Sequence, residues 1–189
     1  MGVVFGFLPF LVFAVLSSVI GATYALIAGA AVSAALIARG WRNGASFKLL
    51  ECGTFVLFVA VSVYSATAGN SLSIAGVRLC VDGGLLAVVM ITMAARRPFT
   101  LDYAKEQVAR EYWNRPAFIH ANYVITAGWA VAFLVMVVAD AVLLLLPDVP
   151  RAVGIVAIAA AMFGAVAFTR RYAAMSRAAA QRVANTLPG

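Results

Sequence analysis

Long apolar runs separated by clusters of positive charge restrict the fold of this chain more than any other feature. All of its 14 Lys and Arg residues except Arg78 and Arg151 fall in three short stretches between those runs: Arg39, Arg42 and Lys48; Arg96, Arg97, Lys105, Arg110 and Arg115; and Arg170, Arg171, Arg177 and Arg182. A helix needs about 20 apolar residues to cross a bilayer, and short loops rich in Lys and Arg stay on the cytoplasmic side. The pattern therefore predicts a multi-pass membrane protein with these stretches in the cytoplasm.

Composition supports lipid, rather than water, as the solvent around this chain. Of its 189 residues, 65% are hydrophobic and 11% are charged, and a soluble domain of this length cannot bury so much apolar surface. The net charge of +7 is accounted for by the distribution of Lys and Arg among the loops. We therefore expect anionic membrane lipids as neighbours, and no nucleic-acid partner.

We predict an all-α bundle of about six spans in one membrane domain, residues 1–189. The spans lie near 4–20, 22–38, 49–66, 74–95, 121–146 and 152–169. With six spans, both ends of the chain lie in the cytoplasm. Because Pro9 interrupts the first segment, a re-entrant first segment is the alternative. In that case only the N-terminus changes side.

The segment 96–120 is the largest polar piece between spans. Thr100 or Asp102 can cap a helix there, which predicts a short amphipathic helix on the cytoplasmic surface, or else a solvated helical loop. Its candidate contact residues are Leu101, Val108, Arg110, Tyr112 and Trp113. The cytoplasmic tail 170–189 has a similar helical composition.

Three ionisable residues, Arg78, Asp82 and Asp140, fall inside predicted spans. Charges at such depths are costly and usually face protein or water. Both acids lie roughly 10 Å below the outer surface at about 1.5 Å per residue, and Arg78 precedes Asp82 by one helical turn. With the outer-half residues Tyr24, Ser62 and Tyr64, they predict either a polar proton or ion site or a purely structural Arg–Asp pair.

Other polar and small residues have simpler interpretations. Lys48 and Glu51, one turn apart, predict a local ion pair at the cytoplasmic start of a span. Small residues at interface spacing predict close helix packing inside the bundle, with a homo-oligomer face as the alternative; they are Ala22, Ala25, Gly29 and Ser33 in the second span and Ala157, Ala161 and Ala165 in the sixth. Because the chain has no metal-ligand spacing, nucleophile elbow or phosphate loop, we expect no catalytic residue, metal or cofactor.

Several short segments between residues 5 and 172 share a family pattern. They are Phe7-Leu8-Pro9-Phe10-Leu11-Val12-Phe13, Lys48 followed by Thr54-Phe55-Val56-Leu57-Phe58, Arg97-Pro98, and Asn122 followed by Trp129-Ala130-Val131 and Phe133. Together they resemble the bacterial intracellular septation protein A family of small inner-membrane proteins. The resemblance implies a role in cell-envelope synthesis and division, with other inner-membrane proteins as partners and no established catalytic residues.

Three hypotheses follow. The first is a noncatalytic inner-membrane protein that acts through helix and lipid contacts in envelope or division assemblies. The second is a small proton- or ion-coupled transporter or channel that uses Arg78, Asp82 and Asp140. The third is an accessory subunit of a larger membrane complex.

Overall fold

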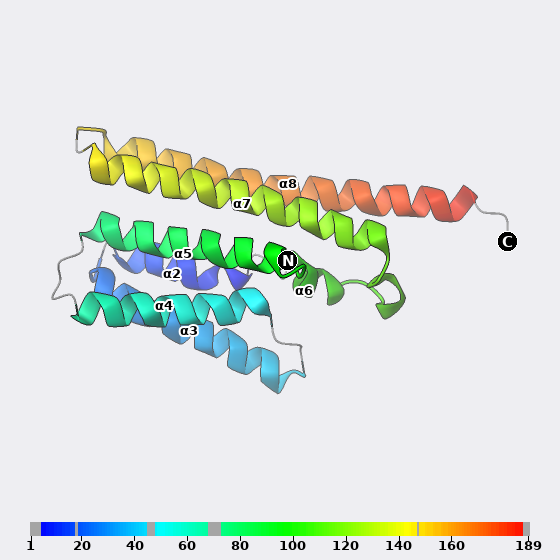
Figure 1. Cartoon of the computed structure of the whole chain (residues 1–189), viewed down its shortest axis with the longest axis horizontal. Coiled ribbons are helices and arrows are strands. Elements are labelled where there is room, and N and C mark those ends of the chain that lie inside the picture. The colour runs from blue at the N-terminus through cyan, green and yellow to red at the C-terminus, as the bar shows by residue number, and fades with distance from the viewer. Residues whose placement is uncertain (1–4, 18, 45–47, 68–72, 147, 187–189) are drawn as a thin grey trace.

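The computed structural model describes residues 5–17, 19–44, 48–67, 73–146 and 148–186, with side chains up to residue 179. All regular secondary structure in these ranges is helical (Figure 1). The elements are α2 (Leu8–Ser17), α3 (Ala22–Arg42), α4 (Leu49–Thr67), α5 (Ile74–Ala94), α6 (Thr100–Lys105), the 3-10 turn η1 (Arg110–Tyr112), α7 (Pro116–Leu145) and α8 (Arg151–Thr186).

Five of the described helices, α3, α4, α5, α7 and α8, are long and apolar enough to cross a membrane. The all-α, multi-pass membrane fold is therefore confirmed. Of the predicted first span 4–20, the structure describes the helix α2, which has ten residues, and a short helical stretch at Phe5 and Gly6, while residues 4 and 18 lie outside the described ranges. At 1.5 Å per residue α2 is about 15 Å long, roughly half of a bilayer core, and the backbone then turns at Gly21, whose φ is 89°.

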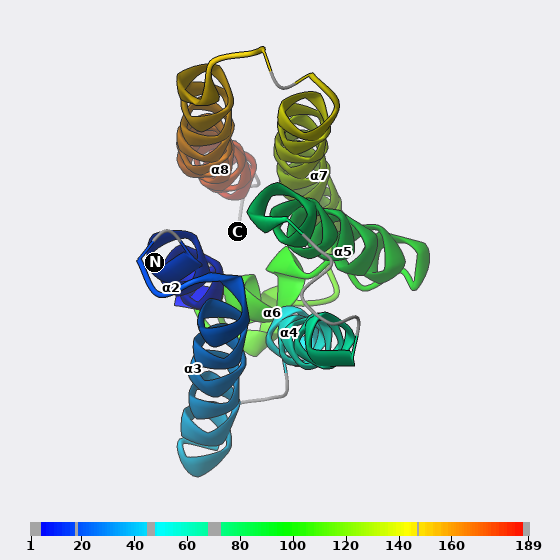
Figure 2. The same cartoon turned by 90° about the vertical axis from the view of Figure 1, so that its left-hand side faces the viewer.

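The long helices run back and forth and pack in chain order. Viewed end-on, α2, α3, α4, α5, α7 and α8 follow one another around the bundle (Figure 2), and each neighbouring pair in that series is in contact. The C-terminal end of α3, the start of α4, α6 and the C-terminal part of α8 lie at one end (Figure 1), which also carries the three basic stretches. We call it the basic end, and the other the opposite end.

Aromatic side chains form the core where α2 meets the other helices. The Phe7 ring stacks on Trp129 with centroids 4.4 Å apart and also contacts Phe99 and Phe133. On the other side of α2, Phe13 packs on Phe58. These ring contacts hold α2 and the residue before it between α7 on one side and α4 on the other.

The small residues of α3 serve internal packing. Ala25, Gly29 and Ser33 are buried, and a Cβ built on Gly29 would lie 2.7 Å from the Phe58 ring. The prediction of a close contact inside the bundle is confirmed here, because only a glycine lets α3 approach α4 this closely.

The segment between α5 and α7 turns inward under the bundle. The backbone leaves α5 through Arg96, which has a φ of 58°, and the Arg97 N–H bonds the Thr92 carbonyl at 2.9 Å, as in a Schellman cap. The Thr100 hydroxyl then donates to the Asn122 carbonyl at 3.0 Å and lies 2.8 Å from the Thr126 hydroxyl. These bonds tie α6 to α7.

The helix expected in segment 96–120 is present but has only six residues, and it is packed against protein. Phe99, Leu101 and Tyr103 are buried, because removing apolar side-chain surface from water lowers the free energy more in the bundle interior than at the membrane surface. Helix α7 begins at Pro116, earlier than the predicted 121, in keeping with the preference for proline in the first helical turn. The predicted tail is likewise not separate, since α8 continues from Arg151 to Thr186.

Candidate functional site

Two acidic residues meet where α5 packs against α7. Asp82 lies eight residues after the start of α5, and Asp140 lies five residues before the end of α7. Because the two helices are antiparallel neighbours, these offsets correspond to similar depths, about 12 Å and 8 Å from the opposite end.

The structure brings the two side chains together, so that the carboxyl groups of Asp82 and Asp140 are within hydrogen-bonding reach of each other. We call them the carboxyl pair. Asp140 is 2% exposed, and no donor from the described residues reaches its buried Oδ2 atom. A carboxylate can only accept hydrogen bonds, so a bond between these two groups requires a proton on one of them.

Arg78 supplies the nearby positive charge, and the carboxyl pair lies within its electrostatic influence. Its guanidinium Nη2 donates to Ser17 Oγ at 3.3 Å. Arg78 takes part in none of the ion pairs found among the described residues. The expected direct Arg78–Asp82 pair is therefore replaced by a bond to the last residue of α2. No signal in the sequence predicted this contact.

Helix α4 packs closely against α5 at a glycine. Gly84, two residues after Asp82, lies against the Leu57 side chain with no room for a Cβ. Ser62 is on the same helix as Leu57, and its Oγ atom is buried with no hydrogen-bond partner in the described part of the chain. Ser62 lies five residues before the end of α4, a depth similar to that of Asp140.

Two residues predicted to line the polar site lie elsewhere. Tyr24 is 68% exposed and Tyr64 is 54% exposed, so both rings lie on the outer surface of the bundle. The sequence gives the depth of a residue along a helix directly, but which way the helix faces depends on the packing of its neighbours. The hydroxyl that contacts Arg78 is instead that of Ser17 on α2.

A second polar cluster lies at the basic end, where α4 begins. Lys48 Nζ lies 2.9 Å from Glu106 Oε1 and 3.6 Å from Glu51 Oε1, which confirms the predicted Lys48–Glu51 pair and adds a partner. The Tyr103 hydroxyl donates to the same Glu51 oxygen at 3.5 Å. We call these four residues the lysine cluster. Asp102 extends it by accepting the Leu49 N–H at 3.2 Å, which caps α4 from another helix.

Tyr103 holds the lysine cluster to the rest of the protein. It is 1% exposed, and its hydroxyl lies against Gly6 near the start of the described chain. Burial raises the pKa of Tyr103, and the charges of Glu51, Asp102 and Glu106 raise it further. The phenol therefore stays protonated as a donor. Sequence reasoning missed Tyr103 and Glu106, because only the position of α6 brings them to Lys48.

The residues proposed for cytoplasmic surface contact separate into two groups. Leu101 is buried and does not face a surface. Arg110 and Tyr112 are exposed, and Val108 and Trp113 are half-buried. The Trp113 indole donates to the Val108 carbonyl at 3.0 Å, and the Arg110 guanidinium lies 5.5 Å from the Trp113 ring. These four form a small surface cluster next to η1.

Comparison with known proteins adds no relative. No family model matches the chain, no curated protein matches it, and no solved structure matches it. The similarity to the septation protein A family therefore rests on the short sequence segments alone.

Proposed function

We propose that the protein is a proton- or ion-coupled membrane transporter or channel whose ion-binding site is the carboxyl pair. The observation that carries the proposal is the meeting of Asp82 and Asp140, on different helices, beside Arg78 inside an apolar bundle. Ionisable groups at this depth are expensive and commonly mark ion pathways.

The chemistry follows from the charges. Two adjacent ionised carboxylates repel each other strongly when water is scarce, so one proton shared between them lowers the electrostatic free energy. Arg78 balances the remaining negative charge. A cation that replaces the proton would meet the same carboxyl oxygens, which suits binding and release of one positive charge at a time.

The surroundings suit a site that changes during transport. The pair lies between two rigid long helices, but α2, which ends at Ser17, is short and bonds Arg78 directly. Short or broken helices next to charged groups are a recurrent design in ion-coupled transporters. Since the basic end is expected in the cytoplasm, the site would open toward the outer face of a bacterial inner membrane.

The test is proton flux into proteoliposomes that contain a pH-sensitive dye, under an imposed gradient and potential. Asp82→Asn and Asp140→Asn should each abolish the flux while the far-ultraviolet circular dichroism of the protein stays unchanged. Asp148→Asn is the matched control, because this acid is exposed in the turn before α8. The proposal is wrong if folded wild-type protein carries no proton flux, or if Asp82→Asn and Asp140→Asn both keep the wild-type flux.

A second candidate is the noncatalytic contact protein, either in envelope or division assemblies or as an accessory subunit of a larger complex. The observation that favours it is the exposure of α8, whose large side chains Val156 and Phe163 are 66% and 78% exposed. The sequence resemblance described above points the same way. Photo-crosslinking from position 163 in native membranes tests it: a specific protein adduct supports this function, and lipid adducts alone contradict it.

A further inference from the structure

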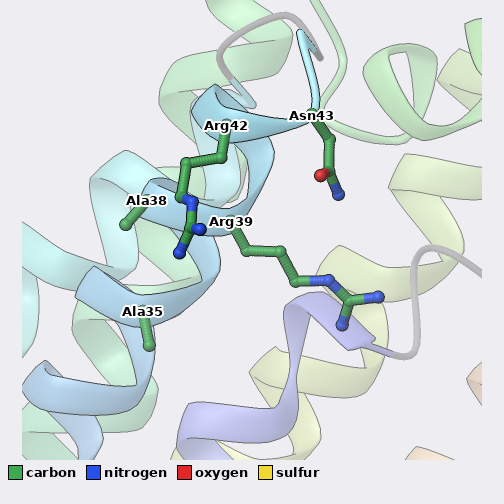
Figure 3. A pocket seen from close by; sticks show the side chains of 5 residues that line it. All are labelled: Ala35, Ala38, Arg39, Arg42 and Asn43. Atoms are coloured by element: carbon green, nitrogen blue, oxygen red, sulfur yellow. The ribbon is translucent and has the colours of Figure 1, made fainter.

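A polar hollow lies at the basic end of α3, far from the carboxyl pair. It has a volume of about 550 Å³, and Ala35, Ala38, Arg39, Arg42 and Asn43 line it. In Figure 3 the two guanidinium groups and the Asn43 amide extend from the last turns of the helix around this space. The two alanines leave the space open because their side chains are small.

The positive charges of the hollow have no counter-charge within the described protein. Neither Arg39 nor Arg42 belongs to the ion pairs found among the described residues, and the sequence contains no acidic residue before Glu51. Three of the four acids in the basic-end segments are engaged elsewhere: Glu51 and Glu106 bind Lys48, and Asp102 binds the Leu49 N–H. Glu111, the fourth, is likewise in no ion pair with Arg39 or Arg42 among the described residues, so both guanidinium groups are free to bind an anion from another molecule.

The hollow lies where the long uncharged part of α3 ends. The helix carries no charged residue from Ala22 to Ile37, so Arg39 and Arg42 fall where it is expected to leave the hydrocarbon region. Trp41, between them, is 76% exposed, and tryptophan is enriched at headgroup depth. Arginine stems can lie along apolar surface while their guanidinium groups reach the phosphates.

Attraction to the helix dipole explains part of this arrangement, since cations stabilise a helix C-terminus. The dipole does not require a hollow, an amide and an exposed tryptophan at the same place. A free phosphate ion satisfies the arginines but leaves the apolar wall uncovered. A phospholipid satisfies both, with its phosphate at the arginines and its glycerol and upper acyl chain against the alanines.

We propose that this hollow binds the phosphate group of an anionic phospholipid. Arg39 and Arg42 lie three residues apart and so share a helix face, from which guanidinium groups donate charge-assisted hydrogen bonds to phosphate oxygens. The Asn43 amide adds a donor for the phosphate or a headgroup hydroxyl. This inference is independent of ion transport by the carboxyl pair.

The experiment measures lipid retention by native mass spectrometry of detergent-purified protein, with phosphatidylglycerol as the probe and phosphatidylcholine as the neutral comparison. Arg39→Gln/Arg42→Gln should reduce retained phosphatidylglycerol by about tenfold or more, given about 1.5–3 kcal/mol for hydrogen bonds to charged groups. Arg170→Gln/Arg171→Gln removes the same charge from exposed positions on α8 and should leave retention unchanged.

Three results would overturn the proposal. One is equal loss of phosphatidylglycerol in both double variants, which would indicate only a general charge effect. The second is equal retention of phosphatidylcholine and phosphatidylglycerol by the wild-type protein. The third is full displacement of phosphatidylglycerol by millimolar inorganic phosphate, which would assign the hollow to the free anion. Retention that depends on the anionic lipid, resists phosphate and requires Arg39 and Arg42 supports it.

Discussion

The carboxyl pair and the lysine cluster both bury acidic side chains in an apolar bundle, but they neutralise charge in different ways. In the lysine cluster, Lys48 lies between two glutamates and Tyr103 donates to one of them. In the carboxyl pair, two acids face each other, and Arg78 bonds Ser17. The comparison indicates that the first arrangement fixes helices in place, whereas the second leaves a position for an exchangeable proton or cation.

The sharpest test of this contrast compares one acid from each cluster in the same flux assay. Asp140→Asn should lower proton flux by at least about tenfold, as expected when a proton-transferring group is removed. Glu51→Gln should leave most of the flux, because the amide oxygen still accepts the Tyr103 hydrogen bond. Equal losses of flux from two folded variants would mean that both clusters belong to one pathway and that the contrast is false.

Removal of the lysine should have the largest effect on stability. Lys48→Met leaves Glu51, which is 9% exposed, without its counter-charge. Breaking a buried pair costs about 3–5 kcal/mol, and we expect roughly 2 kcal/mol here because Glu106 is partly solvated. The thermal unfolding midpoint in detergent measures the loss, with exposed Arg97→Met as control. Similar midpoints for the two variants would show that the lysine cluster does not hold α6 to α4.

Alkaline pH should weaken the lysine cluster through Tyr103. Because the pKa of Tyr103 is raised in the folded protein, its contribution to stability is complete below the unfolded-state pKa of about 10 and is lost as pH rises above that value. The loss approaches about 1.4 kcal/mol per pH unit. Unfolding midpoints between pH 9 and 11 should fall more steeply for wild type than for Tyr103→Phe, and parallel curves would contradict the assignment.

The smallest effects should come from two serines near the carboxyl pair. Ser17→Ala removes the acceptor of the Arg78 hydrogen bond and should cost about 1 kcal/mol. Ser62→Ala removes a buried hydroxyl that has no partner among the described residues, so stability should stay the same or rise slightly. A clear loss of stability or flux from Ser62→Ala would instead indicate that this hydroxyl takes part in the ion site.

The sequence by itself determined the membrane class, the expected orientation and the depth of each charged residue. Apolar run length and loop charge carry this information directly, so α3, α4 and α5 lie close to their predicted ranges, whereas α7 begins five residues earlier and α8 continues 17 residues further than predicted. The sequence also gave the Lys48–Glu51 pair, because residues one helical turn apart must be neighbours. Sequence reasoning left the first segment open, because Pro9 allowed both a full span and a re-entrant segment.

Only the tertiary structure decided which side chains meet. Depth along a helix follows from the rise per residue, but the direction that a side chain faces depends on the neighbouring helices. That is why Asp82 and Asp140 come together while Tyr24 and Tyr64, in the same half of the bundle, face outward. The same reason placed α6 against the basic end of the bundle, with Tyr103 and Glu106 at Lys48, since Phe99 and Leu101 are buried against the protein.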